Sequence, residues 1–216
     1  VNPIDRKAEN YKKISQLQQL SAENEPLLQN LTDTIDSKFG THSTKPDFKE
    51  PKEIELKTTR QETKERKPWY EVEHVRDALR TTSIVDNLDV LPGIIREIKA
   101  GGEFKIINPD MDKLLNPTQR GWRMVALDLQ ASNGQIVEYQ IVPREMKEAG
   151  KIGHAQYKEF RGMDKNLMTD EQALAKAEAD RQQVLLYRGA WEAYLRRTGQ
   201  TEEQILQIVE QARREL

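Results

Sequence analysis

Apolar positions along the chain recur at two spacings, and these divide the sequence into helices and strands. Helical patterns cover residues 5–21, 21–40, 56–67, 86–102, 144–161, 170–197 and 202–215. Strand patterns, rich in β-branched residues or alternating, cover residues 80–85, 103–109, 122–130 and 135–142. This order predicts an α+β fold, with a small mixed β-sheet, helices packed on it, and helical extensions at both ends.

Three regions follow from this pattern. Residues 1–53 are expected to form a helical hairpin and a linker, with Ser21 capping the second helix and Pro26 in its first turns. Residues 54–162 hold every predicted strand and form the expected core domain. Residues 163–216 form a C-terminal helical extension, whose N-cap candidates are Thr169 and Thr201.

Composition narrows the classes of function. The chain has 34 basic and 36 acidic residues, a net charge of −2, so charge alone predicts no nucleic-acid or membrane partner. The absence of cysteine excludes disulfides, thiol nucleophiles and thiolate metal sites, and it fits action in the cytosol. No apolar run approaches the roughly 18 residues that span a bilayer. The chain starts at Val1, which suggests trimming or a longer parent polypeptide.

Two polar residues interrupt the strand pattern over 135–142. Glu138 and Gln140 are two positions apart and therefore share a face, whereas Val137 and Tyr139 face the core. On the pattern alone, a strand whose polar face is exposed to solvent is the simpler interpretation. Asp77, just before the first strand, is a second carboxylate that could approach Glu138, and two such carboxylates can hold Mg²⁺.

Basic residues gather upstream of these carboxylates. Lys57, Arg60, Lys64 and Lys67 lie three or four positions apart, so they form one stripe on the predicted helix over 56–67. The stripe is either a solvated helix face or a clamp for the phosphates of a nucleotide.

The order of these motifs resembles the synthetase domain of the RelA/SpoT-type alarmone synthetases. The family has a glycine-aromatic pair, a hairpin, a Glu-x-Gln strand and a helix ending in His-x-x-Tyr-Lys. The matching pieces are "GW" at 121–122, "SNG" at 132–134, "EYQ" at 138–140 and "HAQYK" at 154–158. Upstream, "KTTRQETKERK" and "VRDALRTTSIV" match the family's basic stretch and its Asp before a strand. The resemblance covers residues 54–160.

The resemblance implies a nucleotidyltransferase-like sheet and a pyrophosphokinase, which moves the β,γ-pyrophosphate of ATP to a 3′-hydroxyl. It implies that Asp77 and Glu138 are catalytic and hold Mg²⁺, with Glu138 as the alternative base for the acceptor hydroxyl. The residues implied to bind ATP are Lys57, Arg60, Lys67 and Arg80. The residues implied to bind the acceptor are Trp122, Gln140, His154, Tyr157 and Lys158.

Several positions depart from the family pattern. Trp122 replaces the usual Tyr, Pro143-Arg144 replaces an Arg-Thr pair, and Met124 and Ala126 replace a Ser and a His. An altered acceptor pocket follows, which leaves guanine nucleotides, adenine nucleotides and the 3′ end of tRNA as acceptors. The resemblance also suggests a toxin or effector, with an inhibitor or antitoxin protein as partner.

The hairpin offers a test of register. A two-residue turn at Asn133-Gly134 would pair Leu129 with Glu138, whereas a three-residue loop with left-handed Gly134 would pair Asp128 with Glu138. The pyrophosphokinase hypothesis predicts the second arrangement, which puts Trp122 on the face of Glu138.

Two further hypotheses stay open. One is a catalytically silent nucleotide-binding or protein-interaction domain of the same ancestry, and the other is a structural module with an incidental core. The C-terminal apolar stripe is interpreted as packing. It comprises Leu174, Ala177, Val184, Leu185, Trp191, Tyr194 and Leu195.

Overall fold

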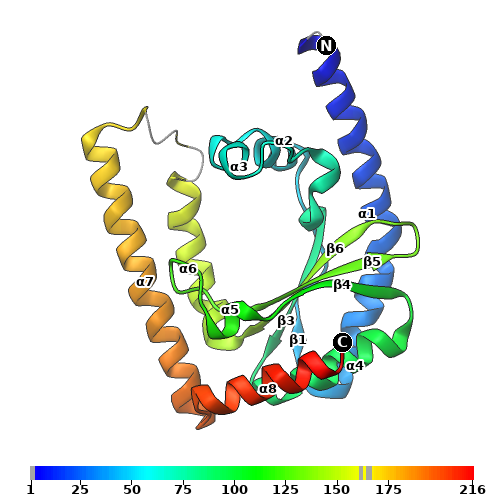
Figure 1. The fold of residues 1–216 in the computed structure, drawn as a ribbon, viewed down its shortest axis with the longest axis vertical. Coiled ribbons are helices and arrows are strands. Elements are labelled where there is room, and N and C mark those ends of the chain that lie inside the picture. Colours follow the sequence, from blue (N-terminus) through cyan, green and yellow to red (C-terminus); the bar gives the residue numbers. More distant parts are fainter. Residues whose placement is uncertain (1–2, 161–162, 164–166) are drawn as a thin grey trace.

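A mixed β-sheet lies at the centre of the molecule, and helices surround it (Figure 1). The computed structural model describes residues 3–160, 163 and 167–216, without the side chains of residues 3–7, 61–62 and 154–159. Within these residues the strand order is β1-β3-β6-β5-β4, and β2 also pairs with β3. β3 and β6 run parallel, while the other pairs are antiparallel. The strands are β1 His42–Ser43, β2 Asp47–Phe48, β3 Leu79–Val85, β4 Phe104–Asp110, β5 Val125–Ala131 and β6 Ile136–Pro143.

The helices cover the apolar face and the ends of this sheet. They are α1 Pro3–Phe39, α2 Pro51–Thr59, α3 Gln61–Arg66, α4 Leu91–Gly101, α5 Asp112–Leu115, α6 Arg144–Phe160, α7 Asp170–Thr198 and α8 Glu202–Arg214. Short 3₁₀ turns are η1 Val72–His74, η2 Arg76–Ala78 and η3 Leu88–Val90. The predicted α+β class with a small mixed sheet is confirmed. Among the described residues, no helix has the length and apolar character needed to cross a membrane.

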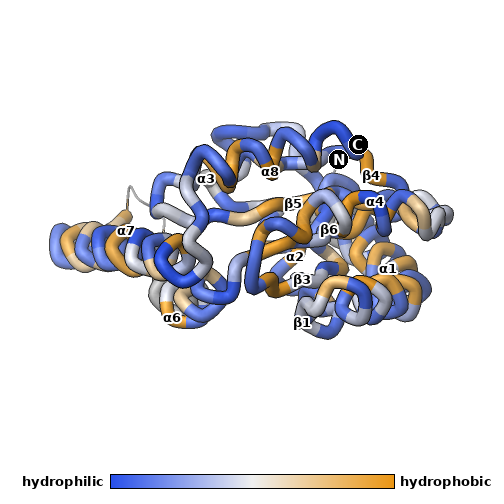
Figure 2. Tube along the Cα trace, turned by 90° about the horizontal axis from the view of Figure 1, so that it is seen from below, coloured by the Kyte–Doolittle hydropathy of each residue, from blue (hydrophilic) through white to orange (hydrophobic). Residues whose placement is uncertain are grey.

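One hydrophobic core joins the sheet to helices from both ends of the chain. Odd-numbered residues of β5 and β6, such as Leu127 and Tyr139, are fully buried in it. They pack with residues of α1, α4, α7 and α8, and the apolar positions gather around the strands in Figure 2. Because side chains alternate along a strand, the even-numbered residues from Ala126 to Gln130 and from Ile136 to Gln140 lie on the other face, which is the polar one. Val142, at the end of β6, is buried.

The N-terminal region is one helix, so the predicted helical hairpin is wrong. Ser21 does not cap a helix: its hydroxyl donates to the Leu17 carbonyl at 2.8 Å and accepts from Gln135 Nε2 at 2.6 Å. Asn24 donates to Gln135 Oε1 at 2.7 Å. These bonds attach the middle of α1 to the β5–β6 hairpin, and Pro26 lies inside the continuous helix. The Ser-Pro signal for a helix start is overridden by these tertiary contacts.

Two other segments also differ from the prediction. The basic helix over 56–67 is divided at Arg60, whose backbone is extended with φ −57° and ψ 136° between α2 and α3. The linker predicted at the end of the region 1–53 contains β1 and β2, which both pair with β3. Pairing with a neighbouring strand therefore orders a segment that has no periodicity of its own.

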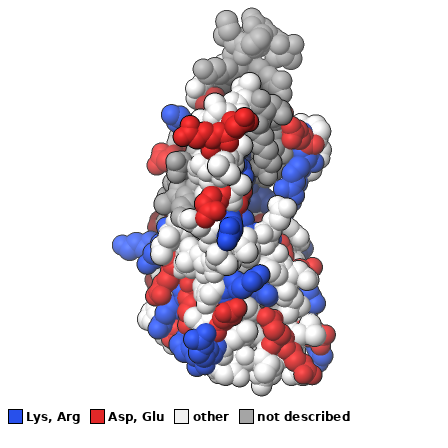
Figure 3. All heavy atoms as spheres, turned by 90° about the vertical axis from the view of Figure 1, so that its left-hand side faces the viewer, with Lys and Arg blue, Asp and Glu red and all other residues white. Residues whose placement is uncertain are grey.

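The C-terminal helices begin at the predicted caps. Thr169 and Thr201 each accept from the backbone three residues later and form capping boxes. Trp191 and Tyr194 are buried as expected, but Leu174 is 73% exposed and Leu185 is 56% exposed. The outward surface of this side of the molecule carries both charge signs interspersed (Figure 3). The stripe therefore packs only in part.

The predicted three-residue hairpin loop is confirmed. Asp128 pairs with Glu138, and the Ala131 amide donates to the Gln135 carbonyl at 2.9 Å, which leaves residues 132–134 as the loop. Gly134 has φ +87°. The strand β5 begins at Val125, so Trp122 precedes it and its position is set by other contacts, described below.

Gly134→Ala is expected to lower the free energy of unfolding by about 1–2 kcal/mol. The left-handed backbone is the physical reason, because nothing lies within 4 Å of a Cβ added there. Chemical denaturation would measure this. Gly134→Asn should cost less, since Asn tolerates positive φ, and exposed Ser132→Ala is the matched control. Equal stability of the Ala and wild-type chains would contradict this account of the loop.

Candidate active site

The polar face of the sheet brings the predicted site residues together. Glu138 lies between Asp128 on β5 and Arg80 on β3 in the strand pairing. One step along, Gln140 pairs with Thr82, and their side chains are 3.4 Å apart. The alternation of the three strands therefore places acidic, amide and basic groups on one surface.

Asp77 lies in the turn η2, immediately before β3, and two lysines bind its carboxylate. Lys57 Nζ is 2.6 Å from Oδ1, and Lys49 Nζ is 3.0 Å from Oδ2. The side chains of Lys49 and Asp77 are only 4% and 14% exposed. Burial would raise the pKa of Asp77, but the two ammonium groups outweigh it and lower the pKa. Asp77 is therefore held ionised.

Glu138 has the opposite electrostatic environment. Burial raises the pKa of this carboxyl, and the negative charge of Asp77 raises it further. A hydrogen bond with Gln140 and the charges of Lys57 and Arg80 oppose this increase without cancelling it. Among the side chains that the structure describes, none forms an ion pair with Glu138 within 4 Å. Two neighbouring carboxylates thus have pKa values shifted in opposite directions.

The predicted ATP-binding residues lie on β3, in α2 and at the two ends of α3. Arg80 lies beside Glu138 and forms an ion pair with Asp47 at 2.9 Å. The ammonium groups of Lys57 and Lys67 lie 6.0 Å and 5.9 Å from the ring centre of Tyr70. Arg60 occupies the break between the two helices. Lys67 is also 5.9 Å from the ring of Trp69, which is 58% exposed.

The acceptor-side predictions fall on β6, α6 and the segment before β5. Gln140 lies on the polar face, and Trp122 packs against α6 and α7. His154, Tyr157 and Lys158 belong to α6, but their side chains lie outside the described residues.

Several residues at the site were not predicted from the sequence. Lys49 lies in the aperiodic segment between β2 and α2, where no pattern distinguishes it. Lys147 on α6 donates to Thr82 Oγ1 at 3.2 Å, and burial together with Arg80 lowers its pKa. No pattern in the sequence distinguishes Lys147 from the other lysines of its helix.

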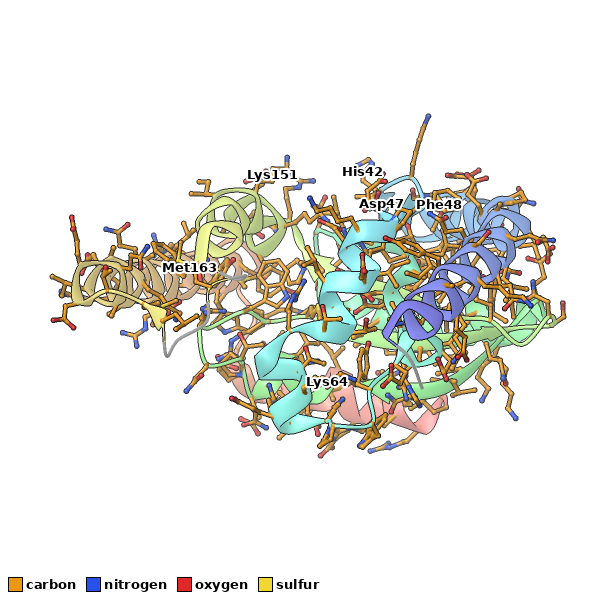
Figure 4. All side chains as sticks on the ribbon, turned by 90° about the horizontal axis from the view of Figure 1, so that it is seen from above. His42, Asp47, Phe48, Lys64, Lys151 and Met163 are labelled. Atoms are coloured by element: carbon orange, nitrogen blue, oxygen red, sulfur yellow. The ribbon has the colours of Figure 1, made fainter. Side chains whose placement is uncertain are left out.

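The labelled residues in Figure 4 show how the polar groups are distributed. Asp47 and Lys151 lie toward the same side of the molecule, and Lys64 lies toward the opposite side.

The carboxylate pair also fits the chemistry of a magnesium site. Carboxylate oxygens are hard ligands, and Mg²⁺ is commonly held by one or two of them together with water and substrate phosphates. Among the described residues, no group of three or more His, Asp or Glu side chains could hold a metal. Asp77 and Glu138 are the carboxylates that could hold Mg²⁺, and in this structure the Asp77 oxygens bind the ammonium groups of Lys49 and Lys57.

Comparison with known proteins gives no match to any family model and no match among curated sequences. Solved structures do match. The small alarmone synthetase 2 of Bacillus subtilis is 15% identical, with a TM-score of 0.64, and the match covers 86% of this chain and 95% of that one. A GTP pyrophosphokinase family protein of Streptococcus pneumoniae is 18% identical, with a TM-score of 0.56 and coverage of 92% and 97%.

A third match is the type VI effector Tas1, solved in complex with its immunity protein. It is 16% identical, with a TM-score of 0.52, and the match covers 84% of this chain and 97% of that one. The matches span nearly the whole of each chain, including helices outside residues 54–160. At these identities a shared fold is what the comparison shows, and the chain has the fold of the small alarmone synthetases.

Proposed function

We propose that the protein is an ATP-dependent pyrophosphokinase, which transfers the β,γ-pyrophosphate of ATP to a hydroxyl of a nucleotide or of tRNA. The observation that carries the proposal is the pair of carboxylates at the polar face, where Lys49 and Lys57 bind Asp77, and Glu138 lies between Arg80 and Asp128 in the strand pairing. The pKa values of the two carboxyls are shifted in opposite directions, which agrees with this geometry. Such a pair supplies an ionised group for charge and a second group suited to proton transfer. The likeness to alarmone synthetases, one of them solved with its product pppGpp, supports the same activity.

Glu138 is the proposed general base. Its carboxylate takes the proton from the acceptor hydroxyl, and the acceptor oxygen forms a bond to the β-phosphorus of ATP. The bond between this phosphorus and the oxygen that bridges it to the α-phosphorus breaks, and AMP leaves with the electron pair. Mg²⁺, when bound, neutralises charge on the phosphates.

The remaining residues bind the two substrates in this proposal. Lys57, Arg60, Lys67 and Arg80 hold ATP. Lys57 bonds to Asp77 and Arg80 lies beside Glu138, which supports this role for these two. Arg60 and Lys67 are assigned to ATP by the resemblance alone. Trp122 and Gln140 hold the acceptor, together with His154, Tyr157 and Lys158. The Tas1 complex with an immunity protein supports the further proposal that this protein is a toxin with an inhibitory partner.

Incubation with labelled ATP, Mg²⁺ and a panel of acceptors tests the proposal. The panel contains GDP, GTP, AMP, ADP, ATP and bulk tRNA, so that the guanine, adenine and tRNA classes are separated. We expect transfer to at least one acceptor. Binding of ATP without any transfer would favour the silent nucleotide-binding domain, and absence of both would favour a structural module.

The pH dependence of kcat/KM should reveal the ionisation of Glu138 as the general base. A base must be ionised, so activity should fall as the pH falls through the raised pKa of this carboxyl. The Gln140 hydrogen bond lowers that pKa. Gln140→Leu should therefore move the acid limb of the pH profile to higher pH. Protonation of ATP itself affects the profiles of the wild-type and variant enzymes equally, so it does not contribute to the difference between them. An identical acid limb in the two enzymes would argue against Glu138 as the base.

A further inference from the structure

Two glycines of α6 allow aromatic rings to lie directly against the helix. A Cβ added to Gly150 would lie 2.8 Å from Cη2 and Cζ3 of Trp122, a separation that real Cβ atoms do not adopt. A Cβ added to Gly153 would lie 2.8 Å from Cζ of Tyr187 and closer still to its hydroxyl. Both positions thus depend on the missing side chain, since any larger residue would displace a ring.

The two rings also contact each other. Trp122 and Tyr187 are 5.2 Å apart between ring centres, with planes inclined at 70°, which is the edge-to-face arrangement that aromatic pairs prefer. Tyr187 belongs to α7 and is 7% exposed. The Trp122 indole is therefore held between a glycine of α6 and a tyrosine of α7.

The turn before Trp122 is fixed to α7 as well. Gly121 has φ +90°, and a Cβ added to it would lie 3.4 Å from Cβ of Tyr187. Arg120 donates to Asp180 at 2.8 Å, and the Arg123 guanidinium lies 4.6 Å from the Trp191 ring centre. Arg120, Gly121 and Arg123, which flank Trp122, thus lie against one face of α7.

The side of α6 that carries Gly150 also approaches the polar face of the sheet. Lys147 reaches Thr82, which pairs with Gln140 on the sheet. Gly150 follows Lys147 by three residues, so both lie on the same side of the helix. Trp122 therefore lies one helical turn beyond the contact between α6 and the polar face.

We propose that Tyr187 is a positioning residue for the nucleotide acceptor. Gly150 and Gly153 together are called the glycine seat. Tyr187 and the glycine seat fix the position of the Trp122 indole, and the acceptor base stacks against this indole. The six-membered edge of the indole fills the space over Gly150, so the seat is matched to Trp122. α7 is thereby part of the acceptor site. This inference rests on the proposed function.

Steady-state kinetics of variants at Gly150 and Tyr187 test this inference. The acceptor used is the member of the acceptor panel with the highest kcat/KM. Gly150→Ala and Tyr187→Leu should each raise the KM for the acceptor roughly 5- to 100-fold, the range that loss of one base stack gives. The KM for ATP should change less than twofold. Tyr187→Phe keeps the ring and should keep the acceptor KM. Ile152→Ala, at a side chain 60% exposed on the same helix, is the matched control.

A rescue variant separates positioning from general damage. Trp122→Tyr replaces the indole with a smaller ring and so removes the clash with a Cβ at position 150. The double variant Gly150→Ala/Trp122→Tyr should therefore have a lower KM for the acceptor than Gly150→Ala alone. Thermal unfolding should show that Gly150→Ala stays folded. Equal changes in both KM values, no change, or no rescue would overturn the inference while leaving the proposed function in place. Absence of transfer by the wild-type chain would overturn both.

Discussion

Glu138→Gln is expected to lower the rate of pyrophosphoryl transfer by a factor of about 10²–10⁴, the contribution that a positioned general base typically makes. The amide keeps the size of the side chain and its place beside Gln140, but it cannot take a proton. The measurement is single-turnover transfer from labelled ATP to the best acceptor, which isolates chemistry from product release.

Stability serves as the control for this variant. A carboxyl whose folded pKa is raised stabilises the fold only when protonated, and this contribution is lost as the pH rises through the raised pKa. Removing the charge of Glu138 should therefore leave the melting temperature at neutral pH unchanged or higher. Binding of a non-hydrolysable ATP analogue should also persist. Wild-type rates in Glu138→Gln would remove Glu138 from the mechanism.

Asp77→Asn is expected to destabilise the fold by about 3–5 kcal/mol, the usual cost of leaving a buried charge without its partner. Lys49 is the reason, since its side chain is only 4% exposed and bonds to Asp77. Lys57 is 26% exposed and can turn toward water. Urea denaturation at pH 7 would measure the loss. Transfer activity should also fall, because the ionised carboxylate beside Glu138 is removed.

A second variant shows whether Lys49 causes this instability. The double variant Lys49→Met/Asp77→Asn has no unpaired charge at position 49. Its loss of unfolding free energy should therefore be smaller than the sum of the two single losses by roughly 0.5–3 kcal/mol, the range for residues in contact. Losses that simply add would contradict a buried Lys49–Asp77 pair.

The contribution of Asp77 to the unfolding free energy should also depend on pH. Because the pKa of Asp77 is lowered in the folded protein, the stabilisation is present above the unfolded pKa of about 3.9 and is lost as the pH falls through the folded pKa.

Local patterns predicted the strands of the site. β-Branched residues predicted β3, and alternation predicted β5 and β6. These features depend on neighbours in sequence, so they are visible without a structure. The capping residues Thr169 and Thr201 were predicted for the same reason. The Asn-Gly turn allowed two registers, and the resemblance to a pyrophosphokinase favoured the one that pairs Asp128 with Glu138.

Contacts between distant segments could not be predicted in this way. Ser21 and Asn24 resemble residues that start a helix, but their partner Gln135 lies more than one hundred positions away. Lys49 lies in an aperiodic segment, and only the pairing of β2 with β3 brings it near Asp77. The glycine seat has no pattern at all, because it is defined by the rings that approach it.

The fate of ATP tests the proposed pyrophosphokinase activity most directly. The wild-type chain is incubated with Mg²⁺, ATP labelled in the β-phosphate and the acceptor panel, and the nucleotide products are separated and quantified. Transfer of the β,γ-pyrophosphate predicts AMP in a one-to-one ratio with an acceptor that has gained the label, and loss of both products in Glu138→Gln. ADP, free pyrophosphate, or unchanged ATP with every acceptor would contradict it.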